Sequence, residues 1–207
     1  MERLAGTPRW LEWGAASAAH AGEGESGDRY VVRFRPDGAL LAVVDGLGHG
    51  PEAARAATAA AALIEEHAAD DLVALLHRCH AALRDTRGVV MCVAAFKPAA
   101  GEMEWLSVGD VEGVLARRDG EGAPKLTWLA QRSGVVGAGL PMVVSPSRLR
   151  LRLGDTLALA SDGVRTDFSQ LTTGANPQDA AERILAECRR ADDDALVLVA
   201  RYRGRTP

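Results

Sequence analysis

Aromatic residues are scarce in this chain of 207 residues, at 4% of the total against 47% for all hydrophobic residues. A core must therefore be built from the small side chains of Ala, Val and Leu. No apolar run approaches the roughly 20 residues that a membrane-spanning helix needs. The first residues, 1–4, lack the charged region and apolar stretch of a signal peptide. We expect a cytoplasmic protein with no membrane segment, and one domain over residues 1–207.

Cysteine is also rare, and the three cysteines are Cys79, Cys92 and Cys188. Their number is odd and no two form a Cys-x-x-Cys pair, which is typical of reduced, buried thiols. None of them begins a Cys-x5-Arg phosphate-binding loop. This absence argues against a phosphatase that uses a thiolate nucleophile.

Positive charge is not in excess, because 24 Lys and Arg stand against 28 Asp and Glu, for a formal net charge of −4. Proteins that bind nucleic acid or anionic lipid usually carry a basic surface. The charge balance therefore argues against both as main partners. A mildly acidic protein can still bind phosphate if a bound cation supplies the positive charge.

Short apolar and β-branched runs separated by turn residues dominate the chain, with a few helical stretches between them. We expect strands at 10–15, 29–34, 39–44, 89–96, 102–108, 113–117, 125–130, 149–153, 156–160 and 195–202. The runs 149–153 and 156–160 are expected to pair as a hairpin. Helices are expected at 51–67, 70–84 and 177–190. Many antiparallel strands with few helices predict an α+β fold, a β-sandwich flanked by α-helices.

Acidic residues recur at the ends of these expected strands. They are Asp28, Asp45, Asp162 and the run Asp192-Asp193-Asp194. The runs 29–34 and 39–44 are joined by a Pro-Asp-Gly turn, and the outer ends of a hairpin lie close together. We therefore expect Asp28 and Asp45 to be spatial neighbours.

A single Asp-Gly pair, such as Asp45-Gly46 or Asp162-Gly163, is usually just a turn. Several carboxylates at the ends of neighbouring strands are different, because like charges in close contact must protonate or bind cations. Oxygen ligands of this kind suit Mg²⁺ or Mn²⁺. The spacing alone leaves a turn and a metal site equally open.

Other features carry less chemistry. The glycine-rich stretch 134–139 lacks the Lys-Ser/Thr of a P-loop and is interpreted as a flap beside the substrate. Arg132, just before it, is a candidate contact for a substrate phosphate or an acid of a partner. Asp110 is interpreted as a turn residue.

The ordered set of acidic motifs resembles the PPM-type (type 2C) metal-dependent Ser/Thr protein phosphatases, in particular the small SpoIIE-like branch that contains stressosome phosphatases. The matching motifs run from about residue 26 to 200, and they are Ser26-Gly27-Asp28, Val44-Asp45-Gly46-Leu47-Gly48-His49-Gly50, Ala160-Ser161-Asp162-Gly163 and Asp193-Asp194. The resemblance implies the four-layer PPM fold. The chain departs from the family at Leu196, where relatives often carry Thr.

Carried over by position, the resemblance implies a centre of two Mn²⁺ or Mg²⁺ ions that activate water for attack on phosphorus. Asp45 would bridge both ions, with Asp28 and the Gly46 carbonyl on one of them. Asp162 and Asp193 would hold the other ion, with Asp194 as the alternative in register. His49 is a candidate general acid, or alternatively an ordinary residue at a helix start.

The resemblance also implies the substrates, which would be phosphorylated STAS-domain proteins of a bacterial stressosome. No sensor or coiled-coil segment is expected before the catalytic unit, which favours a stand-alone enzyme of this branch. We also expect the protein to be a monomer. Two alternatives remain: a phosphatase acting on an anti-sigma-factor antagonist, and a catalytically silent binding module of the same fold.

Overall fold

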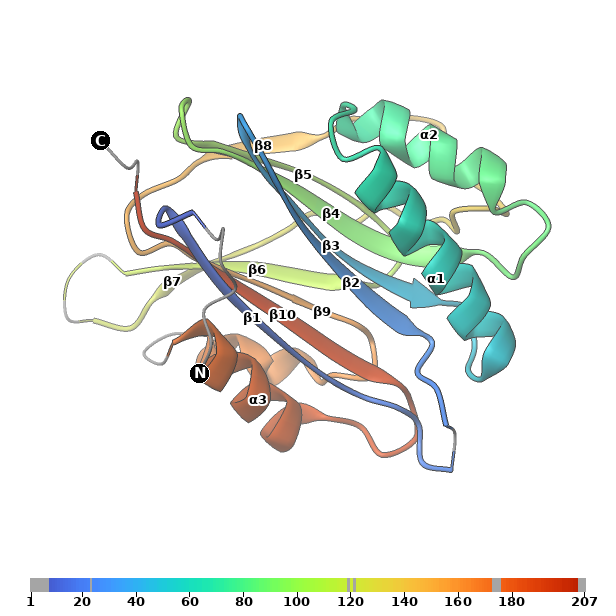
Figure 1. Ribbon diagram of the computed structural model, residues 1–207. Coiled ribbons are helices and arrows are strands. Elements are labelled where there is room, and N and C mark those ends of the chain that lie inside the picture. Colours follow the sequence, from blue (N-terminus) through green and yellow to red (C-terminus); the bar gives the residue numbers. More distant parts are fainter. Residues whose placement is uncertain (1–7, 23, 119, 121, 173–175, 205–207) are drawn as a thin grey trace.

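Two antiparallel five-stranded sheets stack face to face, and helices cover the outer side of each (Figure 1). The computed structural model describes residues 8–22, 24–118, 120, 122–172 and 176–204. Sheet A has the spatial order β1 (Leu11–Ala18), β10 (Ala195–Tyr202), β9 (Thr156–Ala160), β6 (Glu112–Arg117), β7 (Lys125–Trp128). Sheet B has the order β2 (Asp28–Arg35), β3 (Gly38–Gly46), β4 (Val89–Lys97), β5 (Glu102–Val108), β8 (Ser147–Arg150). The expected helix-flanked β-sandwich is confirmed.

The helices are α1 (Pro51–Glu66), α2 (Leu72–Ala82) and α3 (Pro177–Cys188), with a short 3₁₀ helix, η1 (Thr166–Leu171). In Figure 1, α1 and α2 lie over sheet B, and α3 lies over sheet A. The buried face of α1 consists almost entirely of alanine, which lets the helix approach β2 and β3 closely. The side chain of Asp71 caps α2 by accepting from the amides of Val73 and Ala74.

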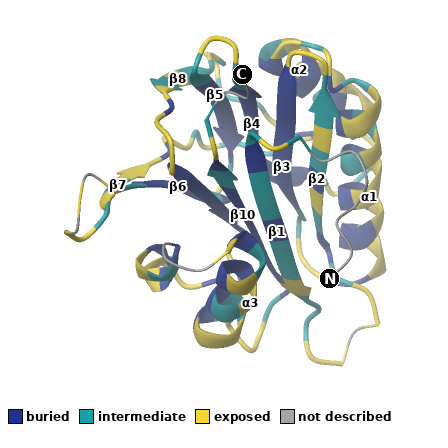
Figure 2. Cartoon of the chain, turned by 60° about the vertical axis from the view of Figure 1, so that its left-hand side comes forward, coloured by how far each residue is buried: buried dark blue, intermediate teal, exposed yellow. Residues whose placement is uncertain are grey.

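The central strands of sheet B are buried on both faces, because the helices cover one face and sheet A the other. Leu40, Ala42 and Val44 pack with the helices, whereas Leu41 and Val43 point between the sheets. Figure 2 shows this burial along β3 and β4, in contrast to the exposed β7. The alternation explains why these strands read as continuous apolar runs in the sequence.

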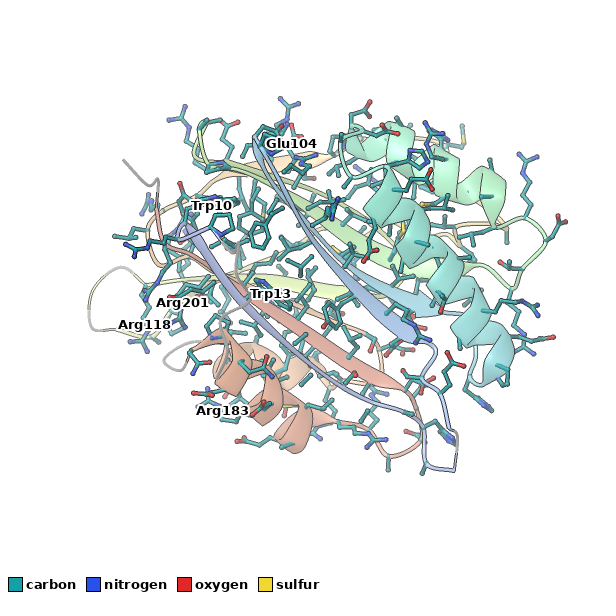
Figure 3. All side chains as sticks on the ribbon, viewed as in Figure 1. Trp10, Trp13, Glu104, Arg118, Arg183 and Arg201 are labelled. Carbon is teal, nitrogen blue, oxygen red and sulfur yellow. The ribbon has the colours of Figure 1, made fainter. Side chains whose placement is uncertain are left out.

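Aromatic pairs join the two sheets along the edge formed by β1 and β2. The rings of Trp10 and Phe34 meet edge to face at 6.1 Å, and those of Trp13 and Tyr30 lie 5.9 Å apart. Figure 3 shows both tryptophans at this edge. These four aromatic residues thus connect the two sheets at the side where β1 and β2 are the edge strands.

One expected pairing is wrong, because residues 149–153 and 156–160 do not form a hairpin. β8 pairs with β5 in sheet B, whereas β9 pairs with β6 and β10 in sheet A. The intervening turn is held instead by Asp155, whose carboxylate binds the guanidinium of Arg117 at 2.5 Å. The chain therefore crosses from one sheet to the other at this point. The expected edge strand at 10–15 is confirmed as β1, which pairs with β10.

Among the described residues, no helix combines the length and the apolar character needed to cross a membrane.

Candidate metal centre

The hairpin of β2 and β3 brings two acids together at one end of the sandwich. Asp28 is the first residue of β2 and stands directly opposite Asp45 in the antiparallel register. Asp28 is almost completely buried, with 4% of its surface exposed, and Asp45 is half-buried. The neighbourhood expected from the hairpin is confirmed.

The second pair of acids comes from sheet A at the same end of the molecule. Asp162 follows the end of β9, and Asp193 precedes the start of β10, the strand beside it. Ser161 links this pair to the first: its hydroxyl donates to the Asp28 carboxylate at 2.7 Å and accepts from the amide of Leu196 at 2.9 Å. A hydrogen bond also joins the side chains of Asp45 and Asp162.

These loops enclose a cavity of about 150 Å³, which we call the metal cavity. Its lining residues are Asp45, Leu47, Gly48, His49, Val90, Asp110, Asp162, Asp192 and Asp193. Three of the four expected acidic ligands therefore face one space. The fourth, Asp28, is not part of this lining and stands opposite Asp45 in the hairpin.

The carboxylates are too close and too buried to carry full negative charge without cations. Burial, followed by repulsion from Asp28, raises the pKa of Asp45 from its ordinary 3.8 to about 9. Burial also raises the pKa of Asp28 to about 7, although its hydrogen bond from Ser161 acts in the opposite direction. The pKa of Asp162 is raised mainly by burial and next by Asp193. A bound cation would lower the pKa of all three carboxyl groups, because positive charge stabilises their ionised form.

The donor set fits hard divalent cations. Mg²⁺ in proteins is commonly bound by one or two carboxylates and keeps several waters. Within the described part of the chain, no three Asp, Glu, His or Cys side chains converge as the ligands of one ion. Among these described residues the acids therefore do not form a closed site for a single ion, such as the four-ligand site of structural zinc.

Asp193 and Asp194, which the sequence leaves as alternatives, lie in different surroundings. Both carboxylate oxygens of the buried Asp194 accept backbone hydrogen bonds, from His20 at 2.8 Å and from Gly27 at 2.7 Å. Asp193 lines the metal cavity. This geometry favours Asp193 as the ligand and gives Asp194 the task of holding the loop that leads into Asp28.

Gly46 lies under helix α1 and is not among the residues that line the metal cavity. A Cβ atom at this position would stand 2.2 Å from the carbonyl oxygen of Ala53. Its amide donates to the carbonyl of Gly27 at 3.1 Å. Glycine is therefore required here for close packing of α1 on β3, whether or not its carbonyl binds a cation.

His49 lines the metal cavity and is exposed to solvent. Its ring stacks on that of His20, with centroids 5.1 Å apart and an interplanar angle of 19°. The backbone of His20 is itself held by Asp194. His49 is thus an exposed residue of the cavity lining whose ring is held against that of His20.

Comparison with known proteins agrees with this geometry. Residues 35–203, most of the chain, match the family model for stage II sporulation protein E (SpoIIE). The chain belongs to the SpoIIE family of PPM-type phosphatase domains.

Relatives of this SpoIIE-family domain include the phosphoserine phosphatase RsbX of Bacillus subtilis (strain 168), which is 30% identical over 101 residues. The alignment covers 48% of this chain and 51% of RsbX, so the chain spans about half the length of this curated relative. A solved structure from work on the bacterial stressosome, a modular system adapted to control secondary messenger signalling, is 30% identical and has a TM-score of 0.85. That match covers 92% of this chain and 99% of the other.

A crystal structure of RsbX in complex with magnesium matches with a TM-score of 0.83 and covers 95% of this chain and 97% of that chain. Its sequence identity is 19%, so this likeness shows the fold alone. The magnesium belongs to that structure of RsbX.

Two acids outside the expected set of ligands also line the metal cavity of this SpoIIE-family domain. Asp110 was expected to be a turn residue, and Asp192 was expected only as part of the acidic run before β10. Asp110 stands two residues after the end of β5, as Asp162 stands two residues after the end of β9, so the same strand-end pattern could have indicated it. Arg132, the candidate contact for a substrate phosphate or an acid of a partner, donates to the carbonyl and hydroxyl of Ser145 at 3.4 and 3.2 Å.

Proposed function

We propose that residues 1–207 act as one metal-dependent protein serine/threonine phosphatase domain. The observation that carries the proposal is the meeting of buried acids from both sheets around one small cavity. A catalytically silent module would gain nothing from this cluster, because buried like charges destabilise the fold. Membership of the SpoIIE family supports the same reaction class.

In this proposal Asp28, Asp45, Asp162, Asp193 and the Gly46 carbonyl would hold two Mn²⁺ or Mg²⁺ ions. Such ions, when bound, polarise a phosphoryl group and lower the pKa of water. The protein's own contribution is to position the oxygen ligands. The hydrogen bond from Ser161 orients Asp28, and the backbone amides that donate to Asp194 hold the loop that leads into Asp28.

His49 is proposed as the general acid that protonates the departing serine or threonine oxygen. Its place in the cavity lining and its stacking on His20 support this role. A positioned acid of this kind typically contributes two to four orders of magnitude to rate, roughly 10²–10⁴-fold.

The proposed substrates are phosphorylated STAS-domain proteins of a bacterial stress-signalling complex, the stressosome. The similarity to RsbX and to a structure from stressosome work supports this choice. We propose further that the protein acts in the cytoplasm as a monomer, where its three buried cysteines remain reduced thiols.

The test is hydrolysis of p-nitrophenyl phosphate and of a phosphoserine-containing STAS-domain protein, each with Mn²⁺, with Mg²⁺ or with EDTA. We expect turnover of both substrates with the cations and none with EDTA. Asp45→Asn should remove the activity, whereas Asp85→Asn, the same change at an exposed acid, should keep it. Activity that persists in EDTA would overturn the metal-dependent mechanism. If phosphate is released faster from a phosphorylated anti-sigma-factor antagonist than from the stressosome protein, the antagonist is the better candidate substrate.

A further inference from the structure

A second cavity of about 500 Å³ adjoins the metal cavity. We call it the flanking groove, and its walls are formed by Leu47, Val90, Asp110, Gln131, Ser133 and Val135, with two glycines. The two cavities share Leu47, Val90 and Asp110. A chain that delivers a phosphorylated side chain to the metal cavity would therefore run through or past this groove.

The outer wall of the groove is held firmly, although its sequence is rich in glycine. The backbone of Val136 exchanges two hydrogen bonds of 2.9 Å with Val89, and the Val136 side chain is completely buried. The amide of Gly137 donates to Nδ1 of His80 on α2 at 3.0 Å. The segment interpreted as a flap is thus anchored to both β4 and α2. A preformed wall loses little conformational entropy when a ligand binds.

The walls of the groove carry apolar, neutral polar and acidic side chains. Leu47, Val90 and Val135 provide apolar surface, and Gln131 and Ser133 provide neutral polar groups. Asp110 is acidic, and none of the described residues that line the groove is Lys or Arg. Arg132, the nearest cation in sequence, is engaged with Ser145 instead.

We propose that the flanking groove binds the residue beside the phosphoserine of a protein substrate and selects an apolar or basic side chain there over an acidic one. This inference rests on the proposed phosphatase function and adds to it a sequence preference. An acidic side chain would be repelled by Asp110 and would find no Lys or Arg among the described residues that line the groove. The acids proposed to hold the cations add nothing to this repulsion, because the bound cations would neutralise them. An apolar side chain would be buried against Leu47 and Val135.

Because the two cavities adjoin, the part of a substrate next to its phosphorylated side chain would lie in the flanking groove. The metal cavity, at about 150 Å³, has room for a phosphorylated side chain with its cations but not for a polypeptide. The adjoining main chain must lie outside it, and the flanking groove shares its rim. A small aryl phosphate, in contrast, has no neighbouring residue to place there.

The first experiment measures kcat/KM of the wild type with Mn²⁺ on two series of phosphoserine peptides. In one series the residue before phosphoserine is Leu, Lys, Gln or Glu, and in the other the residue after it is varied in the same way. We expect Leu and Lys to exceed Glu by about tenfold in one of the two series, from one charge repulsion at partly solvated range. Values within about twofold of each other throughout both series would overturn the inference.

Ser133→Lys tests the site itself, because Ser133 is exposed and a longer side chain there need not disturb the core. The new cation should raise kcat/KM for the Glu peptide relative to the Leu peptide by about tenfold. Thr127→Lys, the same charge change at an exposed position on β7, is the matched control and should leave the ratio unchanged. Equal shifts in the two variants would overturn the assignment to the groove.

Hydrolysis of p-nitrophenyl phosphate distinguishes failure of the groove inference from failure of the proposed phosphatase function. If the wild type hydrolyses it with Mn²⁺ but shows no flanking preference among the peptides, the groove inference fails alone. If neither this compound nor any peptide is hydrolysed with Mn²⁺ or Mg²⁺, the proposed function fails and the groove inference fails with it.

Discussion

Asp45→Asn should stabilise the metal-free protein while it abolishes catalysis. The carboxyl group of Asp45 is half-buried opposite Asp28 and beside Asp162, and its pKa is raised to about 9. Keeping this group in place at neutral pH without a cation therefore costs folding free energy. An asparagine side chain has nearly the same shape and carries no charge.

The size of the effect follows from the pKa. Neutral pH lies about three units above the ordinary value of 3.8, and each unit corresponds to about 1.4 kcal/mol. The ceiling is therefore about 4 kcal/mol at pH 7. Solvent screening at this half-buried position reduces the expected gain to roughly 2 kcal/mol, a rise of roughly 4–8 °C in Tm for a domain of this size.

The gain must also depend on pH in a defined direction. The pKa of Asp45 in the folded state lies above its unfolded value, so the folded wild type binds more protons between these two pKa values. The stability of the wild type therefore falls as pH rises from about 4 towards about 9. The advantage of Asp45→Asn should be small at pH 5 and larger at pH 8.

The assay is thermal and urea unfolding in EDTA at several pH values, with Asp85→Asn as a control for loss of one exposed acid. Excess Mn²⁺ should then stabilise the wild type more than the variant, because only the wild type keeps the shared carboxylate. A variant that is less stable than the wild type in EDTA at pH 7, or a difference independent of pH, would refute the reasoning.

Three further substitutions test the supports of the site and the sheet. Ser161→Ala removes the donor to Asp28 and should lower the free energy of unfolding by about 1–3 kcal/mol and weaken Mn²⁺ binding, as measured by urea unfolding and calorimetry. Asp194→Ala leaves two backbone amides without their acceptor and should cost roughly 3 kcal/mol in the same unfolding assay. Gly38→Ala places a Cβ atom 1.9 Å from the carbonyl oxygen of Phe96, so we expect a loss above roughly 3 kcal/mol or failure to fold, read from thermal unfolding.

Each of these variants has a matched control. Ser17→Ala and Asp85→Ala change exposed side chains of the same type, and Gly24→Ala adds a Cβ atom that meets nothing within 4 Å. All three controls should stay within about 0.5 kcal/mol of the wild type. If a control loses as much stability as its partner, the contact named for that partner is not the cause.

Local patterns predicted much of this architecture. Apolar runs bounded by turns located most of the strands, and the hairpin argument placed Asp28 opposite Asp45. Both inferences depend on residues close together in the sequence, where strand periodicity and turn chemistry act directly.

Contacts between distant segments were not predictable in the same way. The turn near Gly154-Asp155 looks like a hairpin, but the ion pair of Asp155 with Arg117 and the pairing of β8 with β5 send the two strands to different sheets. Asp110, after β5 of sheet B, shares the metal cavity with Asp162 and Asp193 of sheet A, and local patterns do not show which strand ends meet. The distinct role of Asp194 depends on the amides of His20 and Gly27, which lie over 160 residues away.

The pairing of the first strand with the last has a consequence for synthesis on the ribosome. Among the described residues β1 has β10 as its only neighbour in sheet A, and the amide of Arg203 donates to the carbonyl of Trp10. Asp28 and Asp45 can meet as soon as β2 and β3 emerge, but Asp193 and β10 are synthesised after all the other described strands of both sheets. A nascent chain would therefore carry half a cation site for most of its translation, and the other half would be completed only when β10 docks between β1 and β9.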